Sequence, residues 1–256
     1  MNISVVLSII LLILMVIVGG KRGLKSFATL IYNFFILFFM LFLISLKIDP
    51  IIVTFSGCIL ISYITLFYIN GINKKTVSSL ISVTLVLLIT MLITYKIGND
   101  AKIQGFGNEQ SETIAYLSLY VQLNFAKLVI CQVLIGLLGA IIDVSISISS
   151  SMNEIHKNDL LISQRSLFIS GMNIGKDILG TMTNTLLFAY IGGFMTLIIY
   201  FNKLQYSIAD ILNTKVFCAE VFQILCGGIG IILIIPITAF ITSKILFLKR
   251  IIKEDS

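Results

Sequence analysis

Residues 126–143, AKLVICQVLIGLLGAIID, form an apolar run close to the length of about 20 residues that a helix needs to cross a bilayer. The chain then continues as VSISISSSMNE, residues 144–154, in which serines, an asparagine and a glutamate interrupt the apolar residues. Backbone polar groups in hydrocarbon must be paired internally, so the apolar run predicts a helix. The polar residues after it predict a protein-lined polar site at the cytoplasmic edge of the membrane.

Six further apolar runs have a similar length, at residues 3–18, 27–46, 51–69, 77–97, 178–200 and 216–242. Of the 256 residues, 58% are hydrophobic and only 12% are charged, whereas soluble domains carry about 25% charged residues. The runs are about twice as long as the strands of a membrane β-barrel. The sequence therefore predicts an all-α, polytopic membrane protein. We expect one domain, residues 1–256, with about seven transmembrane helices and a cytoplasmic segment at 144–177.

The basic residues predict the orientation of these helices, because cytoplasmic loops of membrane proteins are enriched in Lys and Arg. With the N-terminus outside, the cytoplasmic segments hold twelve of them: Lys21, Arg22, Lys25, Lys74, Lys75, Lys157, Arg165, Lys176, Lys244, Lys249, Arg250 and Lys253. The outer segments hold five: Lys47, Lys96, Lys102, Lys203 and Lys215. We therefore expect an outer N-terminus and a cytoplasmic C-terminus. Residues 113–125 either lie in the outer interface or lengthen the helix that follows them.

A stripe of small and polar residues follows one face of helix 126–143 and its continuation. Gly136, Gly139 and Ala140 allow another helix to approach closely, and Asp143 and Ser147 follow on the same face. One interpretation is a tight helix interface in which serines form hydrogen bonds. Such an interface needs no carboxylate, and an aspartate within a membrane costs at least about 2.5 kcal/mol near the bilayer centre. Asp143 is therefore a candidate for a proton or cation site.

A second polar stripe enters helix 178–200. Asp177, Thr181 and Asn184 lie on one face at helical spacing, and Gly180 is a candidate packing residue. The helix before this one ends inside, and this helix begins inside. We therefore expect Asp177 to face Asp143, or to share a water-filled cavity with it.

The last apolar run, 216–242, carries the third group of candidates. Glu220 lies near its outer end, where it is either part of the polar site or an ordinary interfacial carboxylate. Gly227, Gly228 and Gly230 permit close approach, and Pro236 removes one backbone hydrogen bond. The glycines and the proline together predict either a packing surface or a hinge.

Several other chemistries are not expected. The four cysteines occur singly inside apolar runs, which predicts no metal site and no cofactor. The net charge of +6 indicates orientation and contact with anionic lipids, not nucleic-acid binding. Two aspartates on neighbouring helices could form an intramembrane aspartyl protease, but Asp143 lacks the preceding G-x-G and Asp177 follows Lys rather than Tyr. We therefore expect that the protein is not an enzyme.

Three blocks resemble, in order and spacing, the YibE/F-like membrane proteins: GLLGAIIDVSISISSSMNEI at 136–155, SGMNIGKDILGTMTNTLLFAYIGG at 170–193 and AEVFQILCGGIGIILIIPITA at 219–239. The resemblance covers about residues 120–243. The chain looks like the shorter, YibF-type member, which implies a longer YibE-type partner with an outer domain. The helix arrangement is also similar, more remotely, to the membrane halves of SecD/SecF and resistance-nodulation-division transporters.

The sequence leaves two functions open. The chain is either a transporter or transport-complex subunit with a carboxylate site between its last three helices, or a non-catalytic assembly subunit whose polar stripes bind a partner. The expected partners are the lipid bilayer and either a YibE-like subunit or a second copy of the chain. The expected location is the plasma membrane of a bacterial cell.

Overall fold

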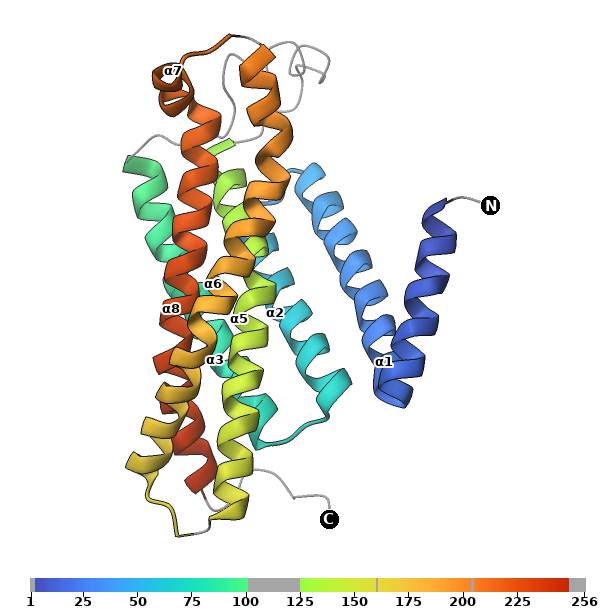
Figure 1. The fold of residues 1–256 in the computed structure, drawn as a ribbon, viewed down its shortest axis with the longest axis vertical. Coiled ribbons are helices and arrows are strands. Elements are labelled where there is room, and N and C mark those ends of the chain that lie inside the picture. Colours follow the sequence, from blue (N-terminus) through green and yellow to red (C-terminus); the bar gives the residue numbers. More distant parts are fainter. Residues whose placement is uncertain (1–2, 101–124, 160, 204, 249–256) are drawn as a thin grey trace.

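A computed structural model describes residues 3–100, 125–159, 161–203 and 205–248, and all regular secondary structure in these ranges is helical (Figure 1). The helices are α1 (Ile3–Ser45), α2 (Pro50–Asn70), α3 (Lys74–Asp100), α5 (Phe125–Asn158), α6 (Gln164–Lys203), α7 (Ile208–Asn213) and α8 (Lys215–Phe247). Six helices of this described part, all except α7, are long and apolar enough to cross a membrane. The prediction for residues 113–125 falls outside the described ranges, apart from Phe125.

Helix α1 contains both of the first two predicted helices, 3–18 and 27–46. It is interrupted at Gly20, which has φ 54° and ψ −131°. A residue with a Cβ rarely adopts this conformation, so glycine allows the sharp change of direction. Figure 1 shows α1 as two arms that meet at an acute bend. The two predicted helices are therefore the two arms of one interrupted helix.

Local capping residues define both ends of α2. The Asp49 side chain accepts a hydrogen bond from the backbone N–H of Ile51 at 3.0 Å, and Pro50 occupies the first turn, where its missing N–H costs nothing. At the other end, Gly71 has φ 74° and its N–H donates to Phe67 O at 2.9 Å. The turn between α2 and α3 is therefore encoded by its own residues.

Helices α5 and α6 extend further than the apolar runs predicted. We expected helices to end at residue 143 and to begin at 178, but α5 continues to Asn158 and α6 begins at Gln164. The serines do not stop α5 because Ser145 and Ser149 are buried and form hydrogen bonds inside the bundle. The 34 residues of α5 measure about 51 Å, against a hydrocarbon thickness of about 30 Å. Part of α5 therefore extends beyond the hydrocarbon.

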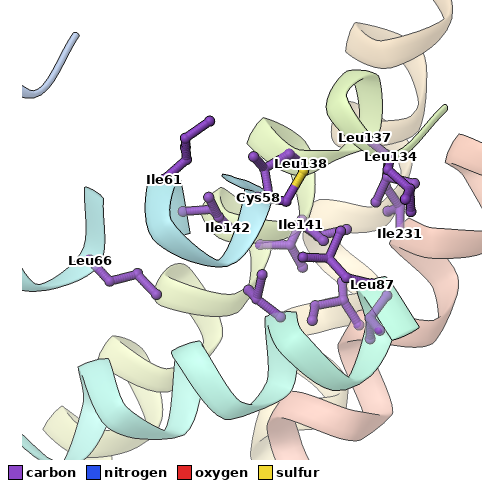
Figure 2. Close-up of a cluster of buried hydrophobic side chains, with 14 of the residues drawn as sticks. Cys58, Ile61, Leu66, Leu87, Leu134, Leu137, Leu138, Ile141, Ile142 and Ile231 are labelled. Atoms are coloured by element: carbon purple, nitrogen blue, oxygen red, sulfur yellow. The ribbon is translucent and has the colours of Figure 1, made fainter. Parts of the chain in front are cut away.

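The core lies where α3, α5 and α8 pack against one another. Leu87, Leu137, Ile141 and Ile231 have no exposed surface, and Figure 2 shows them in one cluster with residues of α2. Helix α6 covers α8 and α5, whereas α2 packs against α5 and α1. Helix α1 packs mainly against α2, so it lies at the edge of the bundle (Figure 1).

Candidate functional site

The Asp143 side chain lies on the outer surface of the bundle, near the middle of α5. Asp143 and Ser147 are exposed and lie one turn apart, whereas Ile142 and Val144 beside Asp143 are buried. Ala140 is half-buried against the core. Within the described ranges, Asp143 forms no hydrogen bond and no ion pair. A carboxylate exposed to hydrocarbon is costly, which favours contact of this face with water or with another chain.

The glycines of the two stripes have different surroundings. A Cβ at Gly136 would lie 2.3 Å from the Tyr190 hydroxyl oxygen and 2.9 Å from the Gln223 amide nitrogen, so a larger residue there would have to displace these side chains. A Cβ at Gly139 or at Gly180 would meet nothing within 4 Å. Gly136 therefore serves packing inside this chain, and the other two glycines leave open surface.

The predicted residues of α6 also face outward. Asp177, Thr181 and Asn184 are all exposed, and the Thr181 hydroxyl donates to its own helix, to Ile178 O at 2.9 Å. In the described part of the chain, no hydrogen bond or ion pair joins Asp177 to Asp143. The geometry thus gives α6 an exposed polar face, and the expected pairing of the two aspartates stays a prediction.

Glu220 has polar neighbours from two other helices. It is half-buried on α8 and lies close to Gln132 of α5. Next to them, the Tyr190 hydroxyl of α6 and the Gln223 amide of α8 approach each other over Gly136. The Tyr190 hydroxyl is buried and has no hydrogen bond of good geometry. We call Glu220, Gln132, Tyr190 and Gln223 the Glu220 cluster. Only Glu220 of these four residues was predicted from the sequence. Each glutamine could have been noticed as an amide side chain within an otherwise apolar run.

Buried hydroxyl groups connect α3, α5 and α8, and the sequence analysis did not identify them as a group. Their interhelical side-chain pairs are Ser79 with Ser149 at 2.7 Å, Thr238 to Ser145 at 3.2 Å, and Thr242 to Ser78 at 3.1 Å, and the Ser145 hydroxyl also lies 3.4 Å from Ser79 O. All six residues have no exposed surface. We call them the hydroxyl network. Because Ser145 and Ser149 face inward and Ser147 faces outward, the serine run of α5 serves two different surfaces.

The glycines of α8 lie largely at helix contacts. A Cβ at Gly227 would lie 2.6 Å from a leucine side chain of α6, and one at Gly230 would lie 3.3 Å from a leucine of α5. A Cβ at Gly228 would meet nothing within 4 Å. Helix α8 continues through Pro236 without interruption. Two of the three glycines therefore set how closely α8 packs.

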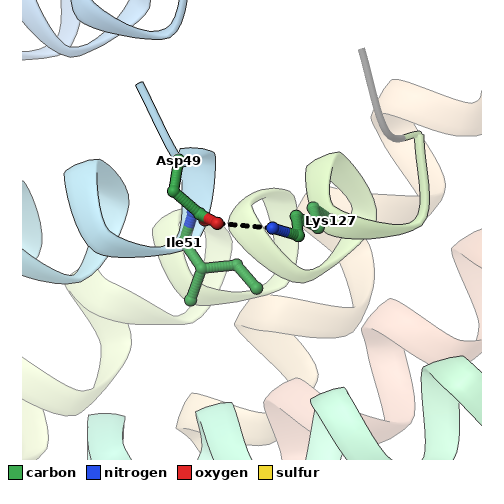
Figure 3. Close-up of polar contacts among 3 residues, drawn as sticks. All are labelled: Asp49, Ile51 and Lys127. Atoms are coloured by element: carbon green, nitrogen blue, oxygen red, sulfur yellow. Dashed lines mark hydrogen bonds and ion pairs between the residues drawn. The ribbon is translucent and has the colours of Figure 1, made fainter. Parts of the chain in front are cut away.

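One ion pair joins α2 to α5 at the rim of the bundle. The Lys127 ammonium group donates to the Asp49 carboxylate, as Figure 3 shows. This hydrogen bond lowers the pKa of Asp49 below its ordinary value of 3.8. Both side chains are about one-third exposed, so the pair lies at the surface of the bundle.

No metal-binding group is found in the described ranges, where no three His, Cys, Asp or Glu side chains come together. The four cysteines are free; Cys218 is exposed, and the other three are buried among apolar residues.

Comparison with known proteins gives one family. The YibE/F-like protein family matches residues 7–248. No curated protein and no solved structure matches the chain. Nothing in these comparisons supports the likeness to SecD/SecF or to resistance-nodulation-division transporters. Together with its long apolar helices, the match over nearly the whole length shows that this multi-pass membrane protein belongs to the YibE/F-like family.

Proposed function

We propose that this chain is a subunit of a membrane transport complex, and that the Glu220 cluster binds a proton or a small cation in that complex. One observation supports this proposal above the others: a half-buried carboxylate, two amides and a phenol come together from α5, α6 and α8. Ionisable and polar groups inside a membrane bundle are costly and typically line ion or substrate pathways.

The outward position of Asp143 supports the proposal that the chain is one subunit of a larger complex. A carboxylate without a partner in its own chain, on a helix with an open glycine surface at Gly139, suits a face that another membrane protein covers. We propose a YibE-like subunit or a second copy of this chain as that partner, in a bacterial plasma membrane. We also propose seven spans, counting the two arms of α1 separately, with the N-terminus outside and the C-terminus inside.

The second candidate function, a non-catalytic assembly subunit, rests on the same exposed face. In that case the polar residues of α5 and α6 only form hydrogen bonds with the partner. Glu220 is then an interfacial carboxylate with no role in ion binding.

Two substitutions separate these functions. The complex is purified with its partner, reconstituted into liposomes, and tested for proton and Na⁺ movement with an internal fluorescent indicator. We expect Glu220→Gln to abolish the flux while the complex stays assembled, because the amide keeps the shape and removes the charge. Glu154→Gln, on an exposed carboxylate in the last turns of α5, is the matched control and should leave the flux unchanged.

Assembly is read out separately by co-purification of the partner. Asp143→Leu should lower the yield of the complex, and Asp143→Asn should preserve it because the amide can still form hydrogen bonds. Normal flux in Glu220→Gln would refute the transport proposal and leave the assembly function as the better explanation.

A further inference from the structure

The exposed surface of α5 carries no large apolar side chain. Between Ala126 and Asn153 the exposed positions, which we call the α5 ridge, are Gln132, Gly136, Gly139, Asp143 and Ser147. The other long helices of the described chain each expose several large apolar residues. Ser145, which bonds to α8, lies about 160° from Asp143 around the helix, so the ridge points away from α8. Its polar composition favours contact with water or protein over contact with lipid.

The polar residues of α6 lie beside this ridge. Gly175 packs against α8, and Gly171 packs against both α8 and α5. At about 100° per residue, Gly171 lies about 40° from Gly175 around the helix axis. Thr185, Thr181 and Asp177 follow in the same sense, at further steps of about 40°. They therefore lie beyond the contact with α5, on the side away from α8. Figure 1 shows α5 and α6 side by side below the point where they cross.

Contacts between α5 and α6 determine which of their residues lie at the same height along the bundle. The two helices are antiparallel, with only residues 159–163 between them (Figure 1). A Cβ at Gly171 would lie 2.5 Å from the Met152 sulfur, and one at Gly136 would lie 2.3 Å from the Tyr190 hydroxyl oxygen. Positions between these two contacts can therefore be matched by counting residues along both helices.

The count gives two level pairs. From the contact of Met152 with α6, Ser147 is five residues away on α5, and Asp177 is six residues away on α6. In the same way, Asp143 is nine residues away and Thr181 is ten. Each pair combines a carboxylate acceptor with a hydroxyl donor. Within the described chain, the Asp143, Ser147 and Asp177 side chains form no hydrogen bond, and the Thr181 hydroxyl bonds only to its own helix.

We infer that this surface binds a second copy of the chain, with α5 of each copy against α6 of the other. Asp143 of one copy accepts a hydrogen bond from the Thr181 hydroxyl of the second copy, and Ser147 donates to the Asp177 carboxylate of the second copy. The inference rests on the proposed function only in that another chain covers the Asp143 face. It does not depend on ion binding at Glu220.

The surface is complementary to itself, which favours a second copy as the occupant. A twofold axis parallel to the helices keeps every residue at its own height, so both level pairs form between copies and each forms twice. Every carboxylate then faces a hydroxyl group and not another carboxylate. Gly139 and Gly180 have open space at their Cβ positions, which allows the helices of the two copies to approach closely.

Cysteine cross-linking tests the height at which the copies meet. Two differently tagged copies of the full chain are expressed together, one with Gly139→Cys and the other with Thr185→Cys, both with the exposed Cys218 replaced by Ser. These positions are level by the same count, so oxidation in the membrane should join the two tags. Asn173→Cys replaces Thr185→Cys as the control. Asn173 is exposed on the same helix but lies twelve residues away, about 18 Å, which is too far for a disulfide.

Energy transfer measures the strength of the association. The purified full chain is labelled at the exposed Cys218 thiol with donor or acceptor dye and diluted with lipid in liposomes. Asp143→Leu removes one acceptor in each copy, so two interhelical hydrogen bonds of average strength are lost. The association constant should fall about sevenfold. Asp143→Asn should retain it, because the amide oxygen still accepts. Glu154→Leu, on an exposed carboxylate beyond the level pairs, is the matched control and should not change it.

Three results would overturn the inference. Energy transfer that is absent at every lipid content would show that the chain does not pair with itself, and that a different chain or water covers this face. Energy transfer without a cross-link between Gly139→Cys and Thr185→Cys would place the contact elsewhere. An unchanged association constant in Asp143→Leu would exclude the hydrogen bonds. The Glu220→Gln flux measurement is separate, so either proposal can fail while the other stands.

Discussion

Removal of the Ser79–Ser149 hydrogen bond tests how strongly the hydroxyl network holds α3 against α5. Both side chains are fully buried, and their oxygens are 2.7 Å apart. Each hydroxyl also lies near a carbonyl of its own helix, at 2.9 Å for Ser79 to Lys75 O and 3.2 Å for Ser149 to Ile146 O. When one serine is replaced, the other can donate its proton to its own helix, so no polar group is left unpaired.

We therefore expect a coupling free energy of about 0.6 kcal/mol between the two residues, the average for interhelical hydrogen bonds in membranes, rather than the maximum of about 1.7 kcal/mol. The measurement is a double-mutant cycle of Ser79→Ala and Ser149→Ala. The free energy of unfolding is obtained from reversible unfolding in mixed micelles of mild detergent and dodecyl sulfate. Ser56→Ala is the control, because Ser56 is exposed and bonds only within α2.

Two results would refute this reasoning. A coupling above about 2 kcal/mol would exceed the known range and mean that neither serine can pair with its own helix. A coupling of zero, with both single variants as stable as wild type, would mean that apolar packing alone holds α3 against α5.

Two further perturbations follow from the geometry. Gly136→Ala should lower the free energy of unfolding by about 1–3 kcal/mol, because its Cβ would lie 2.3 Å from the Tyr190 hydroxyl. Gly139→Ala places its Cβ in open space and should change the free energy of unfolding little. Thermal unfolding of the two variants gives the comparison. The Lys127 hydrogen bond lowers the pKa of Asp49 below 3.8, so the pair stabilises the fold above that pH and its contribution is lost as the pH falls through the lowered pKa. Asp49→Asn keeps a good N-cap and should cost about 0.2–1 kcal/mol at pH 7, with the difference from wild type disappearing in strong acid. An equal difference at both pH values would exclude the ion pair as its cause.

The helical membrane fold could be predicted from the sequence because a helix surrounded by lipid needs a long run of apolar residues. The ends of α5 and α6 could not be predicted, because serine occurs in two different settings in membrane helices. In an apolar run it can mark the membrane edge, or it can pair inside a bundle, as Ser145 and Ser149 do. Only the packing of α3 and α8 against α5 distinguishes these cases.

The site was harder to predict than the fold for a similar reason. Helical spacing correctly describes which residues share a face, but it does not say what that face meets. Asp143 stood out because of its charge, yet the structure gives it no partner in the described chain. Gln132 and Gln223 carry no charge and interrupt their runs only once, although both belong to the Glu220 cluster.

The separation of Asp143 from the Glu220 cluster affects how both are interpreted. Asp143 follows Gln132 by eleven residues on α5, which is about 16.5 Å along the helix. Residues farther apart than about 7–10 Å with no shared partners contribute independently. Charge changes at Glu220 therefore test the proposed ion binding, and changes at Asp143 test the role of the exposed face of α5. An effect of Asp143→Asn on ion movement would have to be transmitted through the bundle or through a partner that contacts both regions.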